Sequence, residues 1–363
     1  MRASRYPRGA AAPVLVEVRR GTIVESRHRG HVVQVDTAGR IERGTGDPDV
    51  LVNLRSAVKP FALVAVLESG AADSLRLSDQ ELAVMAASHT GEDAHVRTLQ
   101  GVLRRSGLSQ TLLALAGDGA PLDKLTAARL ARDGEAPGQI RHMCSGFHVA
   151  SLLLARHAGW SLSDYWQPDH PTQLAVRQVI GRIFGRNSAT LATSVDACGL
   201  LTYAFPLADV ARAYALLAEP SEADAGLRPL VPYLTRIRDA MVAAPEMVGG
   251  TRDSTDTRLM RARPGSLVSK GGAEGLRGIG LLAGARGPGT PAAGVALKIE
   301  DGDAAGRANQ AVSVEALVQL GMLESKTLER LADLHHPAAR DPHGLEVGQT
   351  VAVFELAPIS ELV

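Results

Sequence analysis

Strand-like segments lie at both ends of this chain, and helical patterns fill its middle. Short runs rich in valine and isoleucine, separated by glycines, predict strands at residues 14–18, 22–26 and 31–36, and again at 265–269, 278–283, 293–299 and 350–355. Apolar periodicity and capping signals predict helices between them, among them 57–67, 78–87, 90–103, 148–157, 174–184, 207–218 and 227–244. The order predicts an α+β, sandwich-like fold in which one antiparallel sheet is built from both termini and a helical lobe is inserted.

The same order predicts the domain organisation. Residues 1–55 and 250–363 form the α/β sheet lobe, and residues 56–249 form a mainly helical lobe. A chain of 363 residues is long enough for a two-lobed enzyme of this kind. A parallel doubly wound sheet is not expected, because the regular alternation of strand and helix that it requires is missing.

The charge balance excludes several classes of partner. Lysine plus arginine total 39, as do aspartate plus glutamate, so the chain lacks the basic surplus of a general nucleic-acid binder. No run approaches the roughly 20 apolar residues of a membrane helix. Two cysteines, Cys144 and Cys198, cannot build a disulfide framework and are typical of a reducing compartment. The basic start at Arg2, Arg5 and Arg8 precedes an apolar stretch too short for an export signal. We therefore expect a soluble cytoplasmic protein without nucleic-acid or membrane partners.

The most informative short motif is RSAVKP at residues 55–60. On a helix, positions three apart share a face, which would place the Ser56 hydroxyl near the Lys59 amine. A serine hydroxyl is a weak nucleophile until a base removes its proton, and a lysine whose pKa is lowered by burial or by a neighbouring cation can be that base. The alternative is a surface serine and lysine, because Ser-x-x-Lys occurs often by chance.

Three further segments favour the catalytic interpretation. SHTGE at 88–92 lies in a predicted loop between helices, and CSGFH at 144–148 opens a helix, where backbone N–H groups are free. KGGAEG at 270–275 places Lys270 at a strand end, where it suits a second serine, Ser88, as an electrostatic partner. If these segments meet in space, they predict acyl transfer by serine and lysine.

These motifs, in this order, resemble the L-asparaginase II family, the Rhizobium etli type of asparaginase. The family pattern is Arg-Ser-x-x-Lys-Pro, Ser-His-x-Gly-Glu-x-x-His, Cys-Ser-Gly-x-His, Val-Asp-x-Cys-Gly and Lys-x-Gly-Ala-Glu-Gly, which the chain matches at 55–60, 88–95, 144–148, 195–199 and 270–275. The resemblance runs from the strand at 14–18 to residues 298–302. Five motifs in order are far more specific than any one alone.

The resemblance implies a serine β-lactamase/glutaminase-like fold, a homodimer, and hydrolysis of L-asparagine to L-aspartate and ammonia without an organic cofactor. It makes Ser56 the nucleophile and Lys59 its base, with Ser88 and Lys270 as a second pair. The residues expected to bind the substrate are Arg55, His89, Glu92, His142, Ser145 and Gly272. Family members also bind zinc through two cysteines and a lysine, with an aspartate nearby, and the matching positions are Cys144, Cys198 and Asp196.

Two positions depart from the family pattern. Phe147 stands where the cysteine motif usually has a lysine, and a phenyl ring offers no ligand. His142 stands where an asparagine is common, and its imidazole can either replace the lost zinc ligand or face solvent. Zinc is therefore an open candidate, and the preference between asparagine and glutamine is open as well.

Several of these side chains also have structural interpretations. The two cysteines lie far apart in sequence, and spacing alone favours buried thiols over a metal site. Asp196 is equally a turn residue. His89, Glu92 and His95 form His-x-x-Glu-x-x-His, but Gly91 breaks the helical register that a metal site of this pattern needs. Substrate and structural roles are expected for them instead.

Two other functions remain open on the sequence. A β-lactamase or peptidase would use the same Ser-x-x-Lys nucleophile, although such enzymes usually act outside the cytoplasm. A degenerate family member would bind an amino acid without turnover, and Phe147 is the main support for that alternative.

Overall fold

The structure, a computed structural model, describes residues 11–252 and 254–358. The basic start at residues 2–8 lies outside the described residues. The chain divides into two compact units. Among the described residues, the sheet unit comprises 11–57, 205–222 and 259–358, and the helical unit comprises 58–204, 223–252 and 254–258. No helix within the described residues combines the length and apolarity needed to cross a membrane.

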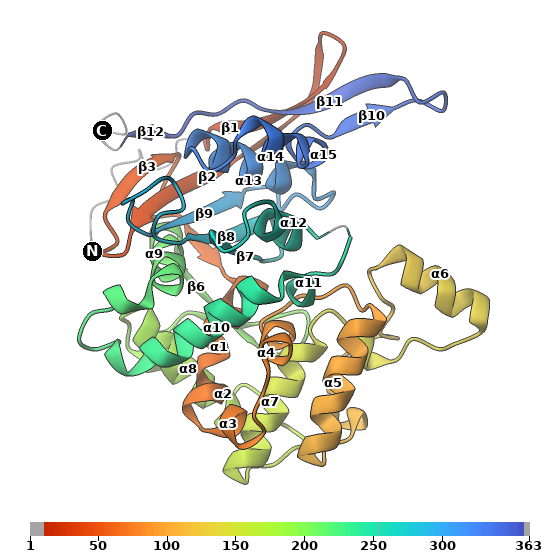
Figure 1. The fold of residues 1–363 in the computed structure, drawn as a ribbon, viewed down its shortest axis with the longest axis vertical. Helices are drawn as coiled ribbons and strands as arrows, with labels where there is room; N and C mark the ends of the chain where they lie inside the picture. The colour runs from red at the N-terminus through yellow and green to blue at the C-terminus, as the bar shows by residue number, and fades with distance from the viewer. Residues whose placement is uncertain (1–10, 253, 359–363) are drawn as a thin grey trace. The chain divides into compact units, whose positions relative to one another are not determined.

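The sheet unit is built around an antiparallel sheet in the order β10-β11-β1-β2-β9-β8-β7, with β3 pairing β2 and β12 (Figure 1). Its strands are β1 (Val14–Arg20), β2 (Ile23–Asp36), β3 (Ile41–Thr45), β7 (Leu267–Gly271), β8 (Leu276–Leu281), β9 (Ala293–Ile299), β10 (Ala338–Arg340), β11 (Glu346–Ala352) and β12 (Ala357–Pro358). Its helices are α9 (Leu207–Ala218), η5 (Pro220–Glu222), α13 (Arg307–Gln319), α14 (Ser325–Glu329) and α15 (Ala332–His335). Strand β4 (Leu51–Asn53) belongs to a separate three-stranded sheet.

The pairing of β2 with β9 confirms that one antiparallel sheet is built from both ends of the chain. Gly30 through Asp36 pair with Ile299 through Ala293. All seven of these β2 residues are buried, which in a strand of alternating side chains means that both faces of the sheet are covered there. The two strands predicted at 22–26 and 31–36 form one continuous strand, because no turn interrupts the ladder between them.

Helix α9 packs on this sheet, although the order of predicted elements places its residues in the helical lobe. Three glycines of β8 and β9 make the approach possible. A Cβ on Gly294 would lie 1.8 Å from the Ala211 carbonyl oxygen, and one on Gly278 would lie 2.0 Å from the Tyr214 ring. A Cβ on Gly280 would come within 2.5 Å of the Tyr214 carbonyl oxygen. Because these glycines have no side chains, the backbone of α9 can lie close to the backbones of β8 and β9.

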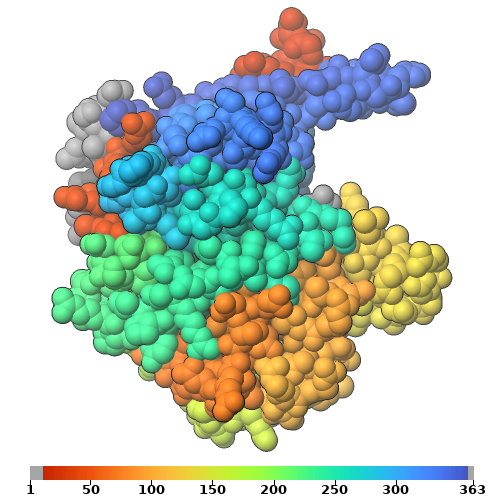
Figure 2. All heavy atoms as spheres, viewed as in Figure 1, coloured from red at the N-terminus to blue at the C-terminus, as the bar shows by residue number. Residues whose placement is uncertain are grey.

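The helical unit packs its helices around α7, in which all residues from Ser145 to Ala155 are buried. Its elements are α1 (Lys59–Ala62), α2 (Val64–Glu68), α3 (Ala71–Ser74), α4 (Asp79–Met85), α5 (Asp93–Ser106), η2 (Gln110–Leu112), α6 (Lys124–Asp133), η3 (Gln139–Arg141), α7 (Ser145–Ala158), α8 (Pro171–Ile183), η4 (Ser188–Thr190), β5 (Thr193–Val195), η6 (Arg228–Leu230), α10 (Val231–Ala243) and α11 (Pro245–Val248). Figure 2 shows the α6 segment standing out from the surface of this unit.

Three elements cross the boundary between the units: η1 (Arg55–Val58), β6 (Leu201–Pro206) and α12 (Thr255–Ala262). The helix predicted at 57–67 is in fact split into η1, α1 and α2. Pro60 lies in this stretch and has no N–H to donate, which disfavours one continuous helix. Helix α4 begins with a capping box, in which Ser78 Oγ accepts from Glu81 N and Glu81 Oε2 accepts from Ser78 N.

Candidate active site

Ser56 lies in a strained turn of the sheet unit. The residue before it, Arg55, has φ +47°, a left-handed conformation that non-glycine residues seldom adopt. Ala57 N donates to Leu54 O at 2.9 Å, which closes the turn, and the buried Tyr214 of α9 donates its hydroxyl to Ala57 O at 2.8 Å. Backbone strain of this kind persists where surrounding structure holds it in place, and Tyr214 is part of that support. The sequence carried no signal for Tyr214.

The chain at the end of strand β7 passes close to the same turn. The Lys270 side chain is 1% exposed, and its Nζ donates to Gly271 O at 2.7 Å. A Cβ on Gly272 would lie 2.6 Å from Leu54 O, so only glycine allows the end of β7 to pass this close to the segment that leads into Ser56. Within the sheet unit, the structure therefore brings together the neighbourhoods of Arg55, Ser56 and Gly272.

In the helical unit, several polar groups surround the Lys59 side chain. This side chain is 3% exposed. The Nζ atom donates to Ala87 O at 2.7 Å and lies 3.2 Å from Ser88 Oγ and 3.2 Å from Cys144 Sγ. A buried amine within hydrogen-bond distance of a serine hydroxyl is the arrangement in which a proton can pass between the two groups. The structure thus joins Lys59 directly to Ser88.

Cys144 and Cys198 lie side by side, although they are far apart in sequence. The hydrogen bond between their side chains and the nearby Lys59 ammonium hold the pKa of the Cys144 thiol well below its usual range. The same hydrogen bond and burial raise the pKa of the Cys198 thiol. In this hydrogen bond, Cys144 is therefore the favoured acceptor and Cys198 the favoured donor.

The side chains of the other candidate metal ligands form hydrogen bonds with backbone groups of the turns in which they lie. Asp196 Oδ1 accepts from Ala197 N at 2.6 Å, and His142 Nδ1 accepts from Cys144 N at 3.1 Å. Phe147 is buried and supplies no donor atom. The described part of the chain contains no group of three or more His, Cys, Asp or Glu side chains arranged to hold a metal ion. Two thiols and one amine fall short of the four ligands of a closed zinc site. Zinc therefore remains a prediction.

His89 and Ser145 form a buried hydrogen-bonded pair. Ser145 Oγ donates to Ile140 O at 2.7 Å, so it accepts from His89 Nε2 at 2.9 Å. His89 Nδ1 in turn accepts from Gly91 N at 3.1 Å. Complete burial, with the His95 and Lys59 charges nearby, holds the pKa of His89 well below its ordinary value, so the ring is neutral. Both residues were predicted to bind substrate, and both have their hydrogen-bonding groups used inside the protein.

His95 stacks on His89 at a centroid distance of 4.7 Å and opens helix α5. Its Nδ1 accepts from Glu92 N at 3.1 Å, and its Nε2 donates to Glu246 O at 3.0 Å. Burial lowers the pKa of His95 as well. The nitrogens of both rings therefore bond to protein groups.

Glu92 accepts several hydrogen bonds from the segment that follows α11. Its Oε1 accepts from Thr251 N at 2.8 Å and from Thr90 Oγ1 at 2.9 Å, and its Oε2 accepts from Thr251 Oγ1 at 2.8 Å. Burial raises the pKa of this carboxyl, but the hydrogen bonds from Thr251 and Thr90 outweigh it and leave the pKa below the ordinary value. Glu92 is thus an ionised, buried and bonded carboxylate.

His148 and Tyr165 fix the loop that carries Cys198. His148 Nε2 lies 3.1 Å from Cys198 O and donates to it. Tyr165 OH therefore donates to His148 Nδ1 at 2.6 Å, and it accepts from Ala114 N at 3.0 Å. Burial lowers the pKa of His148 to about 3. Core packing was the expectation for His148, but its link to Cys198 and the role of Tyr165 were not predicted.

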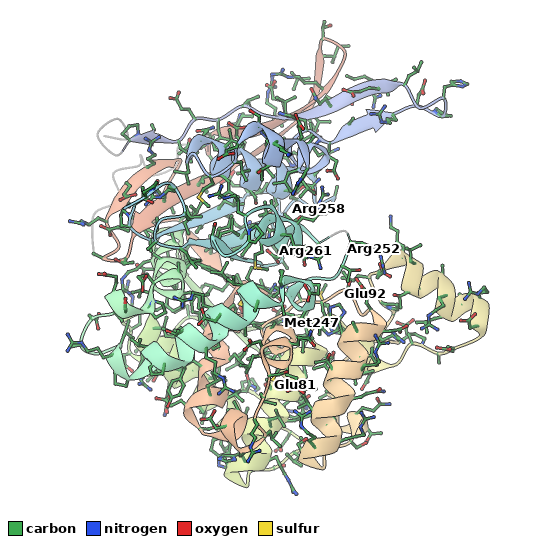
Figure 3. All side chains as sticks on the ribbon, viewed as in Figure 1. Glu81, Glu92, Met247, Arg252, Arg258 and Arg261 are labelled. Carbon is green, nitrogen blue, oxygen red and sulfur yellow. The ribbon has the colours of Figure 1, made fainter. Side chains whose placement is uncertain are left out.

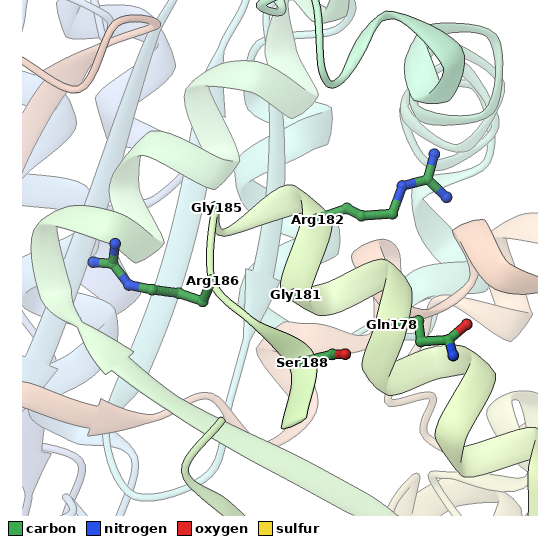
Figure 4. Close-up of a pocket in the computed structure, with 6 residues that line it drawn as sticks. All are labelled: Gln178, Gly181, Arg182, Gly185, Arg186 and Ser188. Carbon is green, nitrogen blue, oxygen red and sulfur yellow. The ribbon is translucent and has the colours of Figure 1, made fainter. Parts of the chain in front are cut away.

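A separate pocket of 450 Å³ lies on the helical unit at the end of α8 (Figure 4). It is lined by Gln178, Gly181, Arg182, Gly185, Arg186 and Ser188. None of the predicted site residues lines it, and Arg182 is paired with Glu68 at 2.6 Å. The predicted site residues therefore lie outside this pocket.

Comparison with known proteins identifies one matching family and several solved structures of low sequence identity. The family model for L-asparaginase II matches residues 16–352. No curated protein matches the chain. Among solved structures, Mglu in its tris and glutamate form is similar with 14% identity, a TM-score of 0.36, and coverage of 87% of this chain and 65% of that chain. A second Mglu crystal structure has 13% identity, a TM-score of 0.35, and coverage of 82% and 68%.

Proposed function

Because the chain belongs to the L-asparaginase II family, we propose that it hydrolyses L-asparagine to L-aspartate and ammonia through serine and lysine side chains. The observation that carries this proposal is the buried Lys59 amine at 3.2 Å from the Ser88 hydroxyl. Family membership supports an amidohydrolase. The choice of asparagine, the nucleophile and its base are our proposals.

In the proposed mechanism, the Lys59 amine accepts the proton of the Ser56 hydroxyl. The serine oxygen then attacks the side-chain amide carbon of asparagine and forms a tetrahedral intermediate. The C–N bond breaks as the nitrogen receives the Ser88 hydroxyl proton, and Ser88 in turn receives from Lys59 the proton that Lys59 took from Ser56. Lys270 is the proposed cationic partner of Ser88 in this step, and ammonia leaves. Water then attacks the ester, giving aspartate and restoring the Ser56 hydroxyl.

The test is the Ser56→Ala variant, assayed for ammonia release from asparagine and glutamine. We expect turnover to fall about 10⁴-fold or more, as it does when a serine hydrolase loses its nucleophile. The matched control is Ser161→Ala, which removes an exposed hydroxyl of the helical unit and should leave activity unchanged. Near wild-type turnover in Ser56→Ala would overturn the assignment of the nucleophile.

Two companion measurements separate the alternatives. Hydrolysis of nitrocefin without ammonia release from asparagine would identify a β-lactamase or peptidase-like activity. Calorimetric binding of asparagine without any turnover would identify a degenerate amino-acid binder, the alternative that Phe147 favours. The cytoplasmic location and the homodimer remain predictions.

A further inference from the structure

Ser88 lies in a segment that is bonded on both edges like the central strand of a sheet. We call residues 88–92 the Ser88 segment and residues 248–252 the strap. Ser88 N donates to Val248 O at 3.2 Å, and Thr90 N donates to Gly249 O at 2.8 Å. On the other edge, His89 N donates to Met143 O at 3.2 Å. The backbone that carries the Ser88 hydroxyl is therefore fixed by the strap on one edge.

Glu92 fastens the strap to the Ser88 segment. Its carboxylate accepts from both the backbone N and the hydroxyl of Thr251, and from the hydroxyl of Thr90. The Glu92 side chain is buried, where charge-assisted hydrogen bonds are strong and an unpaired carboxylate would be costly. Figure 3 shows Glu92 and Arg252 close together at this edge of the helical unit.

Gly250 makes the close approach possible. Its φ is +144°, and a Cβ there would lie 2.2 Å from Thr90 Oγ1 and 2.7 Å from Glu92 Oε1. No side chain fits between the strap and the Glu92 carboxylate. The strap is thus shaped to lie on that carboxylate.

A second fastening lies beside the first. Arg252 Nε donates to Asp123 Oδ1 at 2.8 Å and Arg252 Nη2 donates to Asp123 Oδ2 at 2.5 Å, a two-point pair. Asp123 N donates to Thr90 O at 3.0 Å. Asp123 therefore ties the end of the strap to the middle of the Ser88 segment, and Arg252 also lies 3.8 Å from Glu92.

We propose that Glu92 is a positioning residue, which holds the strap through Thr251 and thereby fixes the Ser88 hydroxyl against Lys59. This inference rests on the proposed function for its catalytic consequence. It replaces the expectation that Glu92 binds the substrate, because three hydrogen bonds and an arginine already take up its carboxylate oxygens.

The test compares Glu92→Ala, Glu92→Gln and Thr251→Val with the control Thr190→Val, an exposed threonine bonded to Asn187 O. We expect Glu92→Ala to lower kcat about 100-fold, with KM nearly unchanged, because misplacing a catalytic group by about 1 Å costs that much. Thr251→Val, which loses one of the three bonds, should show a smaller loss of kcat. Glu92→Gln can still accept from Thr251 N and donate to Thr251 Oγ1, and should recover most of the activity.

Hydrogen exchange of the peptide that contains Ser88 and Thr90 supplies a readout without substrate. We expect faster exchange of these amides in Glu92→Ala and Thr251→Val, and wild-type protection in Glu92→Gln and Thr190→Val. Unchanged exchange in both of the first two variants would overturn the inference. So would a KM that rises as much in Glu92→Gln as in Glu92→Ala, since a substrate-binding carboxylate needs its charge.

The same experiment tests the proposed function and the inference about Glu92 separately. A wild-type protein that hydrolyses no amide would refute the proposed function, while the exchange data would still decide whether Glu92 holds the strap. Thermal unfolding of each variant is also measured, to establish that every comparison is made between folded proteins.

Discussion

Lys59 shows how burial decides the chemistry of a single residue. Its amine is enclosed by the Ala87 carbonyl, the Ser88 hydroxyl and the Cys144 thiol, all within 3.2 Å. The motif predicted a base at this position but not these neighbours. Ala87 and Cys144 belong to segments whose approach depends on tertiary packing, which a spacing of three residues does not encode.

A lysine-to-arginine change tests this residue as the base. Lys59→Arg keeps a positive charge, but a guanidinium stays protonated and cannot accept the serine proton. We expect kcat for ammonia release to fall about 10³-fold. The control is Lys326→Arg on the exposed part of α14, which should behave as wild type. Substantial activity in Lys59→Arg would show that another group removes the proton.

His148 makes a prediction about stability and pH. Its pKa is about 3 in the folded protein, below the value of about 6.5 expected when it is unfolded. The unfolded chain therefore binds a proton below pH 6.5 that the folded chain does not, and stability is lost as pH falls. Between pH 7 and pH 5.5, His148 should cost about 1 kcal/mol of unfolding free energy.

Chemical denaturation at the two pH values measures this effect. His148→Leu should be less stable at pH 7, because Tyr165 OH and Cys198 O lose a partner, yet its stability should change less between the two pH values. The exposed His343→Leu is the control and should keep the wild-type pH dependence. An equal pH dependence in His148→Leu and wild type would contradict the lowered pKa of His148.

At the scale of elements, glycines decide what packs on the sheet. The sequence predicted strands β8 and β9 and helix α9 with useful accuracy, but it placed α9 in the other lobe. Periodicity reports which face of a helix is apolar, not which partner it meets. The signal that was available is the glycine content of the strands, Gly278, Gly280 and Gly294, which marks a surface that another backbone approaches closely.

A side chain at one of these glycines should destabilise both the fold and the turn at Ser56. A Cβ at Gly278 would lie 2.0 Å from the Tyr214 ring, whose hydroxyl holds Ala57 O. We expect Gly278→Ala to lower the unfolding free energy by about 1–3 kcal/mol. The control, Gly101→Ala in α5, has open space and should raise it by about 0.5–1 kcal/mol. Calorimetry of both variants decides, and an unchanged melting temperature in Gly278→Ala would contradict this packing.

At the scale of the whole molecule, the order of predicted elements was sufficient for the fold class, because strands at both ends leave one economical sheet. The boundaries were harder to predict. The division falls between Ala57 and Val58, inside the Ser-x-x-Lys motif, and the sheet unit recruits residues 205–222 from the middle of the chain. Local patterns cannot reveal this, since the division reflects long-range contacts. The candidate site residues came from matching motifs, whereas Thr251, Tyr165 and Tyr214 belong to no motif and emerge only in three dimensions.

The pairing of β2 with β9 also has a consequence for biosynthesis. The two strands are about 260 residues apart, so at about 5–20 residues per second β2 waits on the order of 10–50 s before its partner leaves the ribosome. During that interval, an apolar strand edge is open to other nascent chains. We expect the newborn polypeptide to depend on molecular chaperones, and cooler growth of an expression host to raise its yield of native material.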